Sequence, residues 1–115
     1  MQVTVDRCEG YAILRLEGEF DSADPEGFFG RITDLSESGV KHVALDMSRV
    51  SFINSKAVGA LLKAAKTLRV QDGRLVVSQP SAFCRDILER LGFDRQVQVF
   101  DNDEAAGEFL GEGTS

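Results

Sequence analysis

The sequence predicts an α/β fold: a small mixed β-sheet of about five strands with about four helices packed on it. Strand-like and helix-like patterns alternate along most of the chain, which is typical of α/β proteins. Residues 43–45 are uninterruptedly apolar, as in a strand covered on both faces. Residues 55–70 then repeat apolar side chains at helical spacing. This order favours parallel strands joined by right-handed crossovers.

The N-terminal part predicts a β-hairpin. Residues 2–8 alternate, Glu9-Gly10 is a turn signal, and residues 11–17 alternate again. A loop is expected over residues 18–22, followed by a helix with Pro25 near its first turn and Ser22 or Asp24 as its cap. The helix is predicted from the spacing of Phe28, Phe29, Ile32 and Leu35, with Gly39 just beyond its end.

The central part predicts a strand over residues 41–46, a loop over residues 47–54 and a helix over residues 55–70. A turn at residues 71–73 ends this helix, and residues 74–78 form another buried-type strand. The buried stripe expected of the helix comprises Val58, Leu61, Leu62, Ala65 and Leu68.

The C-terminal part predicts a helix that opens at Pro80-Ser81 and stops at Gly92, then a short strand over residues 97–100. Residues 101–104, DNDE, should cap a last helix that ends near Leu110, and its acidic first turn suits the helix dipole. One domain over residues 1–110 with a frayed tail over 111–115 is expected. The side chains expected to point inward from the first of these helices are Phe83, Ile87, Leu88 and Leu91.

Composition excludes several classes of protein. The net charge of -6 argues against general binding to nucleic acid or to anionic membranes. Cys8, Cys84 and His42 lack the spacing of a zinc site, so we expect two free thiols in a reducing compartment. With neither a signal-peptide pattern nor a membrane-length apolar run, the expected location is the cytoplasm. No nucleotide-binding or nucleophile motif is present, and no enzyme or cofactor is predicted.

Ser55 is the strongest functional lead. It follows the predicted strand and loop and lies at the start of the helix over residues 55–70, where helix dipole and free amides favour a phosphate. Phosphorylation there would add roughly -1.5 to -2 charges. The alternative is that Ser55 is only the helix N-cap, a role that Asn54 could fill equally well.

The rest of this helix and one loop offer candidate contacts. Lys56, Lys63, Lys66 and Arg69 form either an ordinary solvated face or a basic strip for an acidic partner. Ala57, Gly59 and Ala60 are small enough to admit another backbone, although Gly59 could instead serve helix–sheet packing. Asp21-Ser22 lies near Ser55 if its loop is at the same end of the sheet, and otherwise forms a capping turn.

Residues 46–62, DMSRVSFINSKAVGALL, resemble the signature of STAS domains, and the chain is more closely similar to single-domain bacterial anti-sigma factor antagonists. The run Gly18-Glu19-Phe20-Asp21, Gly73 before a strand and residues 88–94 resemble further parts of that family in the same order. The resemblance covers nearly the whole chain and implies a STAS-like fold.

The resemblance also implies a partner switch. In that family the unphosphorylated antagonist binds an anti-sigma factor, often an ATP-using serine kinase, and phosphorylation of the serine matching Ser55 breaks the complex until a serine phosphatase resets it. This chain departs from the usual D-S-S/T-G-L-G run at Asn54, Lys56 and Ala57. The residues that the resemblance and the local pattern together assign to partner binding are Asp21, Ser22, Ser48, Phe52, Ile53, Asn54, Ser55, Lys56, Gly59 and Lys63.

Two other functions stay open at this point. One is a constitutive protein-binding module, an adaptor or scaffold, without a working phosphoswitch. The other is a STAS domain that responds to a nucleotide or small ligand.

Overall fold

The computed structural model describes residues 1–21 and 27–112, which form a five-stranded mixed sheet in the order β1-β2-β3-β4-β5. β1 and β2 form the predicted antiparallel hairpin, and the remaining neighbours pair in parallel. The predicted fold class is confirmed. The strands are β1 (Gln2–Cys8), β2 (Tyr11–Phe20), β3 (His42–Ile53), β4 (Arg74–Ser78) and β5 (Val99–Phe100).

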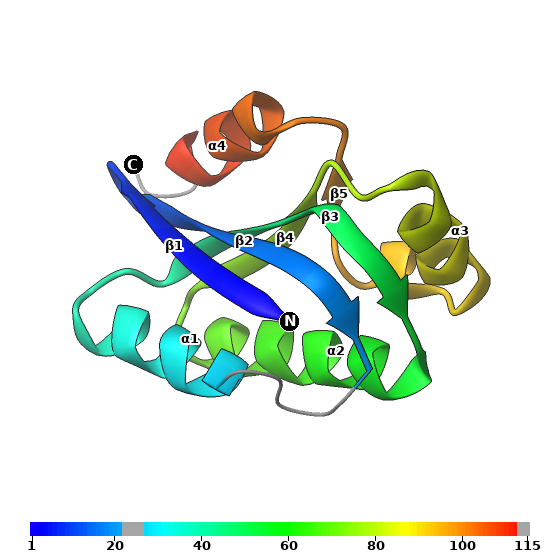
Figure 1. The fold of residues 1–115 in the computed structure, drawn as a ribbon. Coiled ribbons are helices and arrows are strands. Elements are labelled where there is room, and N and C mark those ends of the chain that lie inside the picture. Colours follow the sequence, from blue (N-terminus) through cyan, green and yellow to red (C-terminus); the bar gives the residue numbers. More distant parts are fainter. Residues whose placement is uncertain (22–26, 113–115) are drawn as a thin grey trace.

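Helices cover both faces of the sheet. Figure 1 shows α1 and α2 side by side on one face, α4 on the opposite face, and α3 near the end of β3. A short 3-10 helix, η2 (Phe93–Arg95), follows α3. The four α-helices are α1 (Phe28–Glu37), α2 (Ser55–Val70), α3 (Ala82–Arg90) and α4 (Asp103–Glu112).

The core has two unequal parts, one on each face of the sheet. Val43 and Leu45 of β3 belong to the large cluster that also takes in α1, α2 and α3, whereas Ala44 between them belongs to a small cluster under α4. Alternating side chains of one strand are therefore buried on opposite faces, which explains the uninterrupted apolar run in the sequence. The small cluster comprises Ile13, Ala44, Val76, Ala106 and Leu110.

Two strands are longer than the sequence predicts. The prediction of loops over residues 18–22 and 47–54 was wrong for most of their length, because β2 continues to Phe20 and β3 to Ile53. β3 carries one extra residue at each of two register shifts, since Arg15 and Glu17 pair with Asp46 and Arg49, and Gly18 and Glu19 with Val50 and Phe52. The bulges break the alternation of buried residues and so disguise the strand.

The C-terminal predictions also need correction. Phe83 and Leu91 are 47% and 48% exposed rather than inward, and Cys84 and Leu88 are the buried residues of α3. β5 covers only Val99–Phe100, whereas the sequence predicted a strand over residues 97–100. Val97 lies before the strand and is buried in the large cluster. α4 extends to Glu112, past the expected end.

Two sequence predictions concern residues that are not described. The cap residues expected for α1, Ser22 and Asp24, and Pro25 after them, lie outside the described residues. The same holds for residues 113–115 of the expected tail. Within residues 1–21 and 27–112, no helix has the length and apolarity needed to cross a bilayer.

Gly73 provides a test of how closely the start of β4 packs against the backbone just before β3. A Cβ there would overlap the backbone carbonyl of Lys41, which accepts a hydrogen bond from Arg74 N at 3.1 Å where the two strands begin to pair. We expect Gly73→Ala to lower the free energy of unfolding by about 1–3 kcal/mol, as overpacking does. Urea denaturation measures it.

Gly59→Ala is the matched control. A Cβ at Gly59 meets nothing within 4 Å, so replacing this exposed helical glycine should raise stability by about 0.5–1 kcal/mol. Equal effects of the two substitutions would contradict the packing described for Gly73.

Candidate functional site

The ends of β2 and β3 meet at Asn54. Phe20 pairs with Ile53, so the two parallel strands end at the same level. Asn54 Nδ2 then donates a hydrogen bond to the backbone carbonyl of Asp21 at 3.3 Å, while Asn54 Oδ1 accepts one from Ala57 N at 3.0 Å. One side chain thus caps α2 and holds the chain that leaves β2. Asp21 lies beside the start of α2, and Ser22 is outside the described residues.

Ser55 is the first residue of α2 and is exposed. Capping falls to Asn54, so the alternative in which Ser55 is only a cap does not hold. Among the described residues, the Ser55 hydroxyl has no hydrogen-bond partner. The first intrahelical bond is donated by Val58 N to the Asn54 carbonyl, so the amides of Ser55 and Lys56 lie at the positive end of the helix.

The exposed face of α2 continues from Ser55 through Lys56, Gly59 and Lys63. Gly59 follows Ser55 by four residues and Lys56 by three, and Lys63 follows Gly59 by four, which places them along one side of the helix. A Cβ added at Gly59 would have no neighbour within 4 Å, so helix–sheet packing does not explain this glycine. Lys63 Nζ lies 5.1 Å from the centroid of the Phe29 ring in α1, a cation–π contact.

Ala57 and Ala60 do not belong to this surface. Both are buried, at 0% and 5% exposure, against the large core. The expectation that they admit a partner backbone was wrong, because they lie on the side of α2 that faces the sheet. Gly59 is the small residue that is left at the surface.

Phe52, three residues before Ser55, forms an aromatic pair with Phe83 of α3. The rings of Phe52 and Phe83 stack with their centroids 6.3 Å apart and an interplanar angle of 27°, and the side chains are 41% and 47% exposed. Sequence reasoning missed Phe83, because apolar spacing alone assigned it to the core. Ile53, the neighbour of Phe52, is only 2% exposed and packs in the large core. Its contact with a partner stays a prediction that its burial does not favour.

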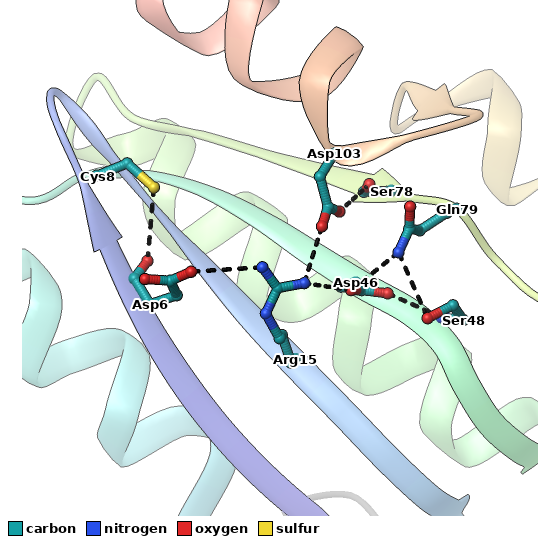
Figure 2. A network of polar contacts seen from close by, with 8 residues as sticks. All are labelled: Asp6, Cys8, Arg15, Asp46, Ser48, Ser78, Gln79 and Asp103. Atoms are coloured by element: carbon teal, nitrogen blue, oxygen red, sulfur yellow. Dashed lines mark hydrogen bonds and ion pairs between the residues drawn. The ribbon is translucent and has the colours of Figure 1, made fainter.

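A second polar group of residues centres on Arg15 of β2, and Figure 2 shows how its side chains converge. Arg15 Nη1 lies 2.6 Å from Asp46 Oδ2 and 2.8 Å from Asp103 Oδ2, and Arg15 Nη2 lies 3.4 Å from Asp6 Oδ2. Asp103 Oδ1 also accepts a hydrogen bond from Ser78 Oγ at 2.5 Å. The group, here called the Arg15 cluster, therefore joins four strands to the first turn of α4.

Asp46 is the buried carboxylate of the Arg15 cluster. Burial is the largest influence on its carboxyl and would raise the pKa, but hydrogen bonds from Ser48, Gln79 and Arg15 outweigh burial and lower it. For Arg15, the hydrogen bond to Asp103 is the largest influence, and it raises the pKa further above neutrality. Both groups are therefore charged at neutral pH.

Ser48 belongs to the Arg15 cluster by its contacts. Its backbone N–H donates to Asp46 Oδ1 at 3.0 Å, and its hydroxyl accepts from Gln79 Nε2 at 3.5 Å. It lies before the second bulge of β3, away from the start of α2. Its role in partner binding stays a prediction. No group of three or more His, Cys, Asp or Glu residues that could hold a metal ion occurs within the described part of the chain.

Comparison with known proteins identifies the family. The family model of the STAS domain matches residues 2–106, nearly the whole chain. The chain belongs to the STAS domain family. The resemblance of residues 46–62 to the STAS signature is thereby confirmed.

Relatives of this STAS domain include anti-sigma factor antagonists. BtrV of Bordetella bronchiseptica, provisionally named as one, is 31% identical over 106 residues, covering 92% of this chain and 91% of BtrV. An anti-sigma F factor antagonist of Paenibacillus polymyxa is 20% identical over 90% of this chain and 89% of that protein.

Solved structures support the fold. A Thermotoga maritima protein provisionally named as an anti-sigma factor antagonist superposes with a TM-score of 0.84 at 20% identity, covering 95% of this chain and 94% of that one. Unphosphorylated SpoIIAA gives a TM-score of 0.77 at 22% identity, with 96% and 97% covered. At these identities the likeness speaks for the fold alone.

The capping assignment generates a paired prediction. Asn54→Ala removes the cap of α2 and should lower the free energy of unfolding by about 1 kcal/mol. Ser55→Ala removes a hydroxyl that caps nothing, and it should leave the unfolding midpoint nearly unchanged. Thermal and urea denaturation of both variants measure the difference. A larger loss for Ser55→Ala would reverse the assignment.

The Arg15 cluster generates a pH prediction. The pKa of Asp46 is lower in the folded chain, so its stabilising contribution is complete above the ordinary value of about 4 and is lost as the pH falls through the lowered value. Asp46→Asn should therefore lower the free energy of unfolding by about 2 kcal/mol at pH 7, because Arg15 loses a charged partner. The loss should be smaller at pH 3.

Asp86→Asn is the control for this prediction. Asp86 forms an exposed ion pair with Arg90 one turn away, and exposed pairs contribute little. Its removal should change the unfolding midpoint only slightly at either pH. A pH-independent loss for Asp46→Asn would contradict the proposed charge pairing.

Proposed function

We propose that this STAS domain is an anti-sigma factor antagonist in a partner-switching pathway, and that phosphorylation of Ser55 controls it. The observation that carries the proposal is that Ser55 is exposed at the start of α2 while its neighbour Asn54 does the capping. A kinase can therefore modify the hydroxyl without undoing the helix. The names of BtrV and of the Paenibacillus relative support the antagonist role.

The phosphate acts on the partner rather than on the fold. Its charge of roughly -1.5 to -2 would lie at the positive end of α2, which tolerates an anion. A partner seated over Ser55 would instead meet a bulky charge in a desolvated contact, which is costly unless that charge is paired. SpoIIAA, a structural neighbour, has been solved in a phosphorylated form, which is consistent with such a cycle in this fold.

The docking surface combines an apolar anchor with a helix face. Phe52 and Phe83 together expose aromatic surface next to Ser55, and interface energy concentrates in such aromatic anchors. Lys56 and Gly59 follow on the exposed side of α2, where Gly59 permits close approach. The proposed partner is an anti-sigma factor of the ATP-binding serine kinase type, and a serine phosphatase would restore the binding form. The chain itself would act in the cytoplasm as a binding protein without catalysis.

A constitutive binding module is the second candidate function. The exposed Lys56 adjoins Ser55 and could pair with a phosphate, which would blunt its effect on the partner. The departure at Ala57 carries no such weight, because that side chain is buried.

The switch is tested by comparing wild type, Ser55→Ala and Ser55→Asp in binding to the cognate anti-sigma factor. Ser55→Asp should weaken binding by about tenfold or more, and Ser55→Ala should bind like wild type. Mass spectrometry after incubation with the kinase and ATP should place the phosphate on Ser55. Binding that ignores Ser55→Asp, with no phosphate on Ser55, would favour the constitutive module.

The aromatic anchor is tested separately. Phe83→Ala should weaken the complex by about tenfold or more, because the ring is half-exposed next to Phe52 and is available to a partner. Leu91→Ala is the control, since Leu91 is equally exposed at the C-terminal end of the same helix. Isothermal calorimetry measures both. Equal losses for the two variants would remove Phe83 from the interface.

A further inference from the structure

The β4 edge of the sheet is only half covered. β5 pairs with Val77 and Ser78 alone, although β4 begins at Arg74 and pairs with β3 along its whole length. The stretch from Arg74 to Val76 therefore has no strand beside it on the β5 side, within the described residues. An uncovered edge of three residues is about 10 Å of backbone that can accept another strand.

The hydrogen-bonding direction along β4 is set by the bonds that its backbone makes. Arg74 N donates to Lys41 O at the start of β3, whereas Val77 N donates to Gln98 O and Gln79 N to Phe100 O on the β5 side. Backbone groups alternate in direction along a strand, so Leu75 shares the direction of Val77. The N–H and C=O of Leu75 consequently point toward the uncovered edge.

A cavity of about 480 Å³ lies at this edge, within the size range of ligand-binding clefts. Leu75 and Val76 line it together with residues 96–98 of the connection to β5. α2 and α4 lie on opposite faces of the sheet (Figure 1), and they contribute Arg69 and Phe109 to its walls. A second cavity of about 330 Å³ shares Arg69 with it and continues along α2.

The cavity walls are basic on a chain whose net charge is -6. Arg69 and Arg74 line the first cavity and Lys66 lines the second. Asp72 is the one acidic side chain among the described residues that line either. In the described part of the chain, Lys66 and Arg69 form no ion pair, and Arg74 packs over the Phe109 ring at 5.2 Å.

We propose that this edge, here called the β4 groove, binds an extended acidic segment of a partner protein by strand addition next to Leu75. Main-chain bonds to Leu75 would hold the segment, and Lys66, Arg69 and Arg74 would select acidic side chains. The groove lies toward the opposite end of α2 from Ser55, and Lys63, which lines the second cavity, also belongs to the α2 face that continues from Ser55. An extended peptide is favoured over nucleic acid, because the edge offers the main-chain N–H and C=O of Leu75, which pair with another peptide backbone.

The probe is a capped peptide of alternating glutamate and valine, titrated into ¹⁵N-labelled protein. The amide signals of Leu75 and Gln98 should shift, and exchange of the Leu75 amide with solvent should slow. A lysine–valine peptide should produce neither effect. The glutamate–valine peptide with a methylated central backbone nitrogen should bind about tenfold more weakly, because it keeps the charge and loses a main-chain donor.

Charge reversal on the protein separates this groove from general electrostatics. Arg69→Glu should weaken peptide binding by about fivefold or more, whereas Arg31→Glu, an equal change in charge on α1 and outside both cavities, should have little effect. Ser55→Asp should leave peptide binding unchanged, so this test does not depend on the phosphoswitch. Spectra of each variant establish that it is folded.

Three results would overturn the proposal. They are the absence of Leu75 shifts at millimolar peptide, equal binding of the methylated peptide, and tighter binding of an oligouridylate than of the peptide at the same groove.

Discussion

The parallel pairing of β2 and β3 constrains the rest of the molecule. Because the register ends with Phe20 opposite Ile53, both chains leave the sheet at one level, and a single amide side chain can serve both. The side-chain oxygen of Asn54 accepts the capping hydrogen bond of α2, and its side-chain nitrogen donates a hydrogen bond to the backbone carbonyl of Asp21. Because Asn54 caps the helix, the hydroxyl of the exposed Ser55 is not engaged as the cap.

The bulges of β3 affect which side chains are exposed near the start of α2. An unbroken strand would alternate side chains strictly, whereas the two extra residues shift that alternation before the strand ends. Val50 and Ile53 are buried while Phe52 is half-exposed, where it meets Phe83 of α3. Irregular pairing thus presents an aromatic surface next to a helix start.

The sequence predicted regular elements well and irregular ones poorly. The bounds of α2 and β4 follow from apolar period and from turn residues, and both agree with the structure. The bulged half of β3 resembled a loop, because its buried residues lack a period of two. Ser55 could be found from its place at the start of a helix, but only the geometry of Asn54 shows that Ser55 is not the cap. Phe83 was hidden because apolar spacing does not distinguish a core position from an exposed anchor.

The small cluster under α4 and the large core under α2 bury unequal numbers of side chains on the two faces of the sheet. α4 buries Ala106 and Leu110 in that cluster, packs Phe109 against it and pairs Asp103 with Arg15, whereas α2 is embedded in the large core. Less buried surface means a smaller free-energy cost of local unfolding. We therefore expect α4 to open at a lower free energy than α2, so that the surface around Ser55 keeps its shape when the opposite face of the sheet is exposed.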